Sequence, residues 1–213
     1  MHRLKYLDGL RGVAIALVVL FHAFARWPKL VGGQYANTAL APGKMGVELF
    51  FLISGYVIFM SLEKSTGIGD FLRRRWLRFF PAMLVTSLFV YLTAPLFLRP
   101  IGQPMLRDLL PGLTFVEPSW WAAAIGSPQG VLEGSFWSLF VEVKFYLVVS
   151  LLYFFIDATA AIVGLVAMFI APMVAGHFSF APTIYAAADL LSSWHWGWFA
   201  SGALYYKFTA TGR

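Results

Sequence analysis

The sequence predicts an all-α, polytopic membrane helix bundle with about six transmembrane helices. Of its 213 residues, 60% are apolar and only 12% are charged, whereas a soluble globular protein carries about 25% charged residues. A soluble fold of this size cannot bury so much apolar surface, and the composition also excludes intrinsic disorder. Apolar runs of about 20 residues, the length that crosses the hydrocarbon core of a bilayer, recur along the chain.

Six such runs define the expected transmembrane segments of one domain that covers residues 1–213. They lie near 8–27, 46–62, 79–98, 136–156, 158–177 and 190–208. Two of the connections between these segments have a distinctive composition. Residues 63–78 form a short basic loop, and residues 99–135 form a longer loop in which Trp120 and Trp121 are expected to anchor at the membrane interface.

The distribution of Lys and Arg predicts that the N-terminus, and with it loop 63–78, is cytoplasmic, while loop 99–135 is external. In this orientation ten basic residues lie inside and five outside, and Lys144 falls within a span. The inside set is Arg3, Lys5, Arg11, Lys64, Arg73, Arg74, Arg75, Arg78, Lys207 and Arg213, and the outside set is Arg26, Lys29, Lys44, Arg99 and Arg107. A cleavable signal peptide ending near Ala25 is an alternative interpretation of the first run. Against it, the charged residues Asp8 and Arg11 lie close to the apolar core that a signal peptide requires.

Several classes of chemistry are excluded by what the sequence lacks. The absence of cysteine removes disulfides, thiol nucleophiles and thiolate metal sites. We expect no metal site, because His177 and His195 have no partners at metal-ligand spacing. The net charge of +6 fits cytoplasmic loops of a membrane protein, so we expect no nucleic-acid partner and a lipid bilayer instead.

Polar residues inside the first two spans are functional candidates, because ionisable groups are costly in a membrane. Arg11 and His22 are eleven residues apart, which places them within about 20° on one helix face and ~16 Å apart along the axis. Glu48 opens the second span, and Gly55 lies on nearly the same face, where it permits close approach of a helix or a substrate. The structural alternatives are headgroup contact for Arg11, an interhelical hydrogen bond for His22 and a solvated carboxylate for Glu48.

The fourth span carries a stripe of hydroxyls around a carboxylate. Ser138, Glu142, Tyr146 and Ser150 recur at i, i+4 spacing. In the predicted orientation Glu142 lies at a depth comparable to His22, so the two side chains are candidates for an acid/base pair. A polar cluster that only joins helices is the alternative.

The basic segment predicts a phosphate-binding site on the cytoplasmic side. Arg74, Arg75 and Arg78 lie within about one helical turn, and guanidinium groups bind phosphate oxygens in bidentate fashion. Trp76 can stack on a planar base or anchor in the membrane. The alternative for the arginines is topology and contact with anionic lipid.

Four segments in this order, LDGLRGVAIALVVLFH, GVELFFLISGY, RRRWLRFFP and FWSLFVEVKFYL, closely resemble the acyltransferase family 3 membrane proteins. The resemblance covers residues 4–150 and implies an enzyme of the bacterial inner membrane. Such an enzyme moves an acyl group, usually acetyl, from cytoplasmic acyl-CoA to a hydroxyl of a cell-surface or lipid-linked carbohydrate. It implies no bound cofactor, because acyl-CoA is the donor substrate, and the acceptor and the oligomeric state are not specified.

The resemblance also assigns roles by position. It implies His22 as the catalytic base, with Glu48 and Glu142 as the other catalytic candidates. The expected acyl-CoA-binding residues are Arg11, Arg74, Arg75 and Arg78, and the expected supporting residues are Ser54, Gly55, Trp137, Ser138 and Tyr146. Lys144 departs from the family pattern, which has a neutral polar residue at this position.

This chain is shorter than typical family members, which have about ten spans where this one has six. We therefore expect the chain to be the N-terminal part of such a protein or a truncated relative. Two other functions stay open. One is a proton-coupled transporter, because buried His and Glu residues also build proton relays. The other is a catalytically inactive accessory subunit, which the short length of the chain allows.

Overall fold

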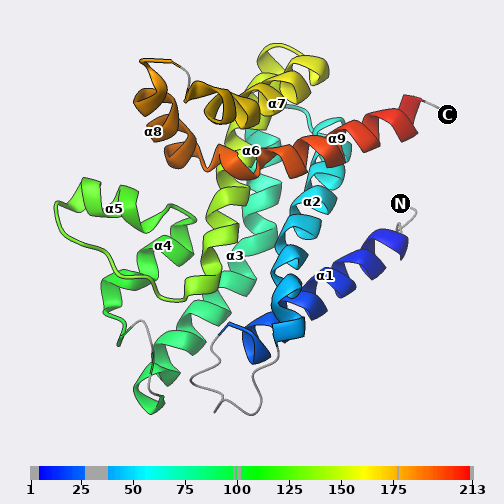
Figure 1. Ribbon diagram of the computed structural model, residues 1–213. Helices are drawn as coiled ribbons and strands as arrows, with labels where there is room; N and C mark the ends of the chain where they lie inside the picture. The colour runs from blue at the N-terminus through cyan, green and yellow to red at the C-terminus, as the bar shows by residue number, and fades with distance from the viewer. Residues whose placement is uncertain (1–4, 27–37, 98, 100–101, 177, 212–213) are drawn as a thin grey trace. The chain divides into compact units, whose positions relative to one another are not determined.

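The computed structural model describes residues 5–26, 38–97, 99, 102–176 and 178–211, and within these ranges it contains α-helices and short 3₁₀ turns but no strand (Figure 1). The all-α prediction is therefore confirmed. The predictions that concern Arg3, Lys29, His177 and Arg213 lie outside the described residues.

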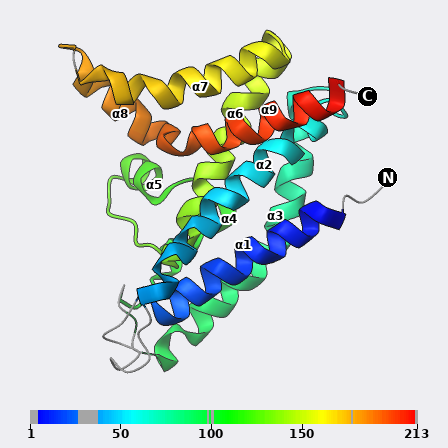
Figure 2. The ribbon, with the colours of Figure 1, turned by 45° about the vertical axis from the view of Figure 1, so that its right-hand side comes forward.

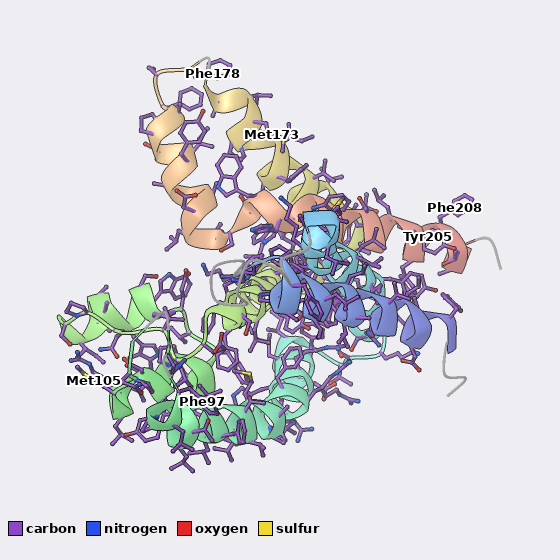
Figure 3. The ribbon with its side chains drawn as sticks, turned by 60° about the horizontal axis from the view of Figure 1, so that its bottom comes forward. Phe97, Met105, Met173, Phe178, Tyr205 and Phe208 are labelled. Carbon is purple, nitrogen blue, oxygen red and sulfur yellow. The ribbon has the colours of Figure 1, made fainter. Side chains whose placement is uncertain are left out.

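Within the described residues, five helical segments are long and apolar enough to cross a membrane. Each overlaps one of the first five predicted spans, but the third begins at Ile68 rather than at the predicted 79. They are Tyr6–Phe24, Ala39–Leu62, Ile68–Leu96, Gly134–Phe155 and Ala158–Ala175. The α-helices in them are α1 (Lys5–Phe24), α2 (Gly46–Leu62), α3 (Ile68–Thr93), α6 (Trp137–Phe155) and α7 (Ala158–Ala175). Bulky apolar side chains project from the surface, among them Met173 on α7 and Tyr205 and Phe208 near the C-terminus (Figure 3), as expected for a protein that faces lipid.

The sixth predicted span, 190–208, is not one continuous helix. Helix α8 (Ala181–Leu191) ends at Ser192, whose φ of 58° lies in the left-handed region. A 3₁₀ turn, Ser193–His195, then leads into α9 (Trp196–Thr211). At 1.5 Å per residue the 16 residues of α9 extend about 24 Å, which is shorter than the ~30 Å hydrocarbon core.

The predicted basic loop 63–78 is wrong in its extent, because helix α3 already begins at Ile68. Asp70, in the first turn of α3, accepts a hydrogen bond from Arg74 Nε at 2.8 Å and one from the backbone N–H of Thr66 at 3.3 Å. A carboxylate at a helix N-terminus and an i, i+4 ion pair both stabilise the helix. The arginines therefore lie on helical turns rather than in a loop.

The described residues form two compact units. The first comprises residues 1–64 and 155–213, with α1, α2, α7, α8 and α9. Here α9 passes across α2 (Figure 2), and the two backbones touch. A Cβ atom on Gly55 would lie 2.0 Å from the carbonyl oxygen of Phe199, and one on Gly202 would lie 1.9 Å from that of Leu52. The predicted close approach of a helix at Gly55 is confirmed, with α9 as the partner.

The second unit, residues 65–154, contains α3, α6 and the segment between them. This segment is not the plain loop expected for 99–135, because it contains α4 (Leu109–Thr114) and α5 (Pro118–Ile125). Helix α4 packs on α3 where Gly112 meets Ser87 and Met83. These two residues lie six and ten positions before the end of α3, so the chain returns about 9–15 Å along the helix it has just left.

Two hydrogen-bonded clusters hold the returning segment together. The carboxylate of Asp108 accepts from the backbone N–H groups of Met105, at 2.7 Å, and Gly130, at 2.8 Å. Arg99 donates to the carbonyl oxygen of Leu132 and lies 3.7 Å from Glu133 Oε2. These contacts join the beginning of the segment to its end.

Candidate active site

His22 lies near the end of α1, and its hydrogen bonds define its tautomer. The ring Nδ1 lies 2.8 Å from the carbonyl oxygen of Val18. A carbonyl oxygen can only accept, so Nδ1 carries the proton and donates it. The Nε2 lone pair then accepts from Arg26 Nη1 at 3.4 Å. This arrangement presents Nε2 as the basic atom, which a general base requires.

Arg26 contacts His22, although the sequence analysis counted it only as an external positive charge. It lies four residues after His22, and this i, i+4 spacing was the available signal. The long contact of 3.4 Å is a weak hydrogen bond. Because Nε2 has a single lone pair, a substrate hydroxyl would have to displace this weak contact with Arg26.

Arg11 shares the uninterrupted helix α1 with His22, as the spacing predicts. Its Nη1 lies 3.7 Å from Asp8 Oδ1, one turn earlier, and both side chains are partly exposed. The expected role of Arg11 in binding acyl-CoA stays a prediction.

Glu48 lies in the first turn of α2, and its Oε2 is buried without a hydrogen-bond partner in the described residues. The ring centroid of His195 lies 5.7 Å from that of Phe51, one turn along α2 from Glu48. The sequence analysis named His195 only as a residue without metal-ligand partners, because no local spacing links it to Glu48. The structure thus places a second histidine beside the helical turn that follows Glu48.

Ser54 and Gly55, the other candidates on α2, are both buried. Gly55 is required for helix packing, because any side chain there would collide with the backbone of α9. Its role in the structure is therefore to allow contact between α2 and α9.

Glu142 is the centre of the second unit's candidate residues. The hydroxyl of Tyr146, one turn later on α6, donates to Glu142 Oε1, and both side chains are buried. All four residues of the predicted i, i+4 stripe lie on α6, and within it Tyr146 and Glu142 are hydrogen-bonded. Ser138 and Ser150 donate to backbone carbonyl oxygens, of Ser135 and Leu147 respectively. Trp137 begins α6 and is exposed.

The three candidate arginines of α3 have different surroundings. Arg75 is buried, with its guanidinium carbon 5.5 Å from the ring centre of Phe71 and 5.9 Å from that of Tyr146. Arg74 is exposed and paired with Asp70, and Arg78 is exposed. Arg75 is therefore packed beside the tyrosine that binds Glu142, which connects the predicted phosphate-binding segment with the predicted catalytic carboxylate.

A pocket of about 160 Å³ lies beside this cluster, within the second unit. Its walls come from α3, α6 and the end of α4, and they include Arg75, Phe79, Thr114, Phe115 and Tyr146. The lining is mostly apolar, with the buried guanidinium as its one charged group.

His22 and Glu48 belong to the first unit and Glu142 to the second, so the expected pairing of His22 with Glu142 stays a prediction. Among the described residues, no group of three or more His, Asp or Glu side chains is arranged to hold a metal ion.

Comparison with known proteins supports an acyl-transferring enzyme rather than a carrier. The chain is 31% identical over 162 residues to O-acetyltransferase OatA of Staphylococcus aureus strain NCTC 8325 / PS 47, which covers 70% of this chain and 24% of the relative. It is also 31% identical over 159 residues to a putative O-acetyltransferase of Staphylococcus aureus strain COL, covering 69% of this chain and 24% of that protein. No solved structure matches.

The chain therefore spans about a quarter of the length of the curated relatives it matches. A family model, described as an acyltransferase domain, matches residues 4–211. This match covers almost the whole chain and confirms the resemblance that the four segments predicted. The chain belongs to the acyltransferase family that this domain defines.

Proposed function

We propose that the chain is part of a bacterial inner-membrane O-acyltransferase. It moves an acyl group, acetyl in the first instance, from cytoplasmic acyl-CoA to a hydroxyl of a cell-surface or lipid-linked carbohydrate. The names of the relatives support transfer of acetyl to oxygen. The observation that carries the proposal is the tautomer of His22, with its proton on Nδ1 and its lone pair on Nε2.

In the proposed reaction the acceptor hydroxyl oxygen attacks the carbonyl carbon of the thioester. His22 Nε2 removes the hydroxyl proton as the new carbon–oxygen bond forms. The carbon–sulfur bond then breaks, and the thiolate of coenzyme A takes up the proton. The products are an O-acyl ester and free coenzyme A, and no oxidant or reductant is needed.

Donor binding is assigned to the arginines of α3. The exposed Arg78 is available to the phosphates of coenzyme A, while Arg74 is engaged by Asp70. Arg75 is buried beside Tyr146, where it can contact the donor. With a cytoplasmic N-terminus, α3 starts on the cytoplasmic side, where acyl-CoA is made.

The direction of transfer is tested with membrane vesicles from cells that produce the chain. Acetyl-CoA labelled in its acetyl group is added outside inverted vesicles, whose cytoplasmic face is exposed, and outside right-side-out vesicles. We expect ester-linked label, released by mild alkali, only with inverted vesicles. Equal labelling in both preparations would contradict the proposal. So would an amount of ester-linked label no higher than in vesicles that contain His22→Ala.

A further inference from the structure

The last turn of α1 ends in a backbone arrangement that fixes the position of Arg26. The N–H groups of Ala25 and Arg26 both donate to the carbonyl oxygen of Phe21, at 2.9 Å each. Such a pair of bonds closes a helix, so the chain leaves α1 directly after Phe24. The side chain of Arg26 extends back to the final turn, because its Nη1 lies 3.4 Å from His22 Nε2.

The imidazole ring of His22 is held by two other contacts. Its Nδ1 donates to the carbonyl oxygen of Val18 at 2.8 Å, and the ring of Phe21 meets it at an interplanar angle of 81° and a centroid distance of 5.2 Å. The guanidinium of Arg26 therefore lies at the basic atom of a ring whose orientation is already set. A cation at a helix C-terminus also stabilises the helix, and this is the structural alternative.

The distance between Arg26 and the base decides where the guanidinium can act. A hydroxyl oxygen that gives its proton to Nε2 lies about 2.6–3.2 Å from that nitrogen. When this oxygen attacks the thioester, negative charge develops on the carbonyl oxygen, which is bonded to the same carbon. The charged oxygen therefore forms within a few ångströms of Nε2, in the region next to the Arg26 guanidinium.

The guanidinium suits this negative charge better than it suits the imidazole. It is always cationic, carries five N–H donors in a planar fork and has no acceptor. Toward Nε2 it makes one long and weak contact, whereas an oxyanion can accept two of its N–H groups at once. An acceptor hydroxyl that displaces Arg26 from Nε2 leaves these donors beside the reacting carbonyl.

We propose that Arg26 is a further catalytic residue, which donates hydrogen bonds to the thioester carbonyl oxygen as that oxygen becomes negatively charged. The proposal rests on the proposed function and adds an oxyanion-stabilising group to it. The acceptor oxygen forms its bond to the carbonyl carbon, His22 Nε2 takes the hydroxyl proton, and the carbonyl electron pair moves to the oxygen that Arg26 binds. When the carbonyl forms again, the carbon–sulfur bond breaks, and His22 returns the proton to the thiolate of coenzyme A.

Three variants separate catalysis from stability. Arg26→Ala removes the guanidinium, and Arg26→Lys keeps the positive charge at the end of α1 but not the planar fork. Lys44→Ala, which removes another exposed cation of the first unit, is the matched control. Each variant is purified as the full chain in lipid nanodiscs, and its midpoint of thermal unfolding is measured beside its kinetics.

Steady-state thioester cleavage is followed over a range of acetyl-CoA concentrations. Removal of an oxyanion-stabilising donor lowers kcat by about 10²–10³-fold, so we expect this fall in Arg26→Ala, with the KM for acetyl-CoA nearly unchanged. Added guanidinium ion should restore part of the rate of Arg26→Ala and leave wild type unaffected. Arg26→Lys should be intermediate, Lys44→Ala should match wild type, and all unfolding midpoints should stay close to that of wild type.

Four results would overturn the inference, and only the last concerns the proposed function. A wild-type kcat in Arg26→Ala would show that Arg26 does not act on the reacting carbonyl. A higher KM with unchanged kcat would assign Arg26 to binding instead. A lower unfolding midpoint, together with a rate that guanidinium ion does not restore, would leave Arg26 as a helix cap. Absence of cleavage by wild type would overturn the activity of this chain, and the inference with it.

Discussion

The hydroxyl of Tyr146 donates a hydrogen bond to the carboxylate of Glu142, one turn away on α6, while its ring lies 5.9 Å from the guanidinium carbon of Arg75 on α3. One tyrosine therefore contacts both the predicted catalytic carboxylate and the predicted acyl-CoA-binding arginine. A carboxylate and a cation buried in a membrane are costly, so this cluster is expected to serve function.

Tyr146→Phe removes one hydrogen-bond donor from the buried Glu142 and keeps the ring beside Arg75. We expect a loss of about 1–3 kcal/mol in the free energy of unfolding, because a buried acceptor loses its partner, and a fall in thioester cleavage. Reversible unfolding in mixed micelles and the cleavage rate measure the two effects. Tyr205→Phe removes an exposed hydroxyl on α9 and is the control. If both variants behave like wild type, the hydrogen bond from Tyr146 to Glu142 contributes neither to stability nor to cleavage.

Gly55→Ala should destabilise the first unit, because the added methyl group would lie 2.0 Å from the carbonyl oxygen of Phe199. Backbone cannot yield as a flexible side chain can, so we expect a loss of about 3 kcal/mol, at the upper end for overpacking. Gly9→Ala on α1 is the matched control, since nothing lies within 4 Å of its added Cβ. The midpoint of thermal unfolding in detergent measures both variants. Equal midpoints would mean that α2 and α9 are not in backbone contact.

Lys144→Met should destabilise the packing of the segment that carries Phe115 against α6, because it removes the ion pair with Glu117. Breaking a buried ion pair costs about 3–5 kcal/mol, and partial exposure of Glu117, at 35%, reduces the effect here. We expect a coupling of about 1–3 kcal/mol in a double-mutant cycle with Glu117→Gln. Lys144→Arg should retain most of the stability. Additive effects of the two single changes would show that the pair contributes nothing.

Arg78→Ala and Arg74→Ala should differ, although both arginines are exposed and lie on the same helix. We expect Arg78→Ala to raise the KM for acetyl-CoA about tenfold, the value of one charge-assisted hydrogen bond, with little change in kcat. Arg74→Ala should have a smaller effect, because its guanidinium is already paired with Asp70. Steady-state kinetics over a range of acetyl-CoA concentrations make the comparison. A larger effect at Arg74 would contradict the assignment.

The sequence predicted features that depend on local spacing. Apolar runs identified five spans, and i, i+4 spacing predicted the helix stripe on which Tyr146 and Glu142 form a hydrogen bond. The same rule, applied to Asp70 and Arg74, would have predicted the true start of α3, but the density of arginines indicated a loop. Hydropathy extended the sixth span across Ser192, since it carries no information about a left-handed residue.

Contacts between distant segments had no signal in a single sequence. The fit of Gly55 against Phe199 was expected only as a close approach to some helix, and nothing pointed to α9. Lys144 was recognised as a departure from the family pattern, yet its partner Glu117 lies in a segment expected to be an external loop. Such pairings depend on how the chain folds back, which local patterns do not contain.

The most direct test of the account is release of coenzyme A from acetyl-CoA by the purified chain in lipid nanodiscs. Because the chain has no cysteine, a thiol reagent detects the product without background from the protein. We expect wild type to release coenzyme A, His22→Ala to be inactive, and Val19→Ala, an exposed position on the same helix, to match wild type. Undiminished release by folded His22→Ala would contradict the role of His22 as the base, and no release by wild type would contradict the catalytic activity of this chain on its own.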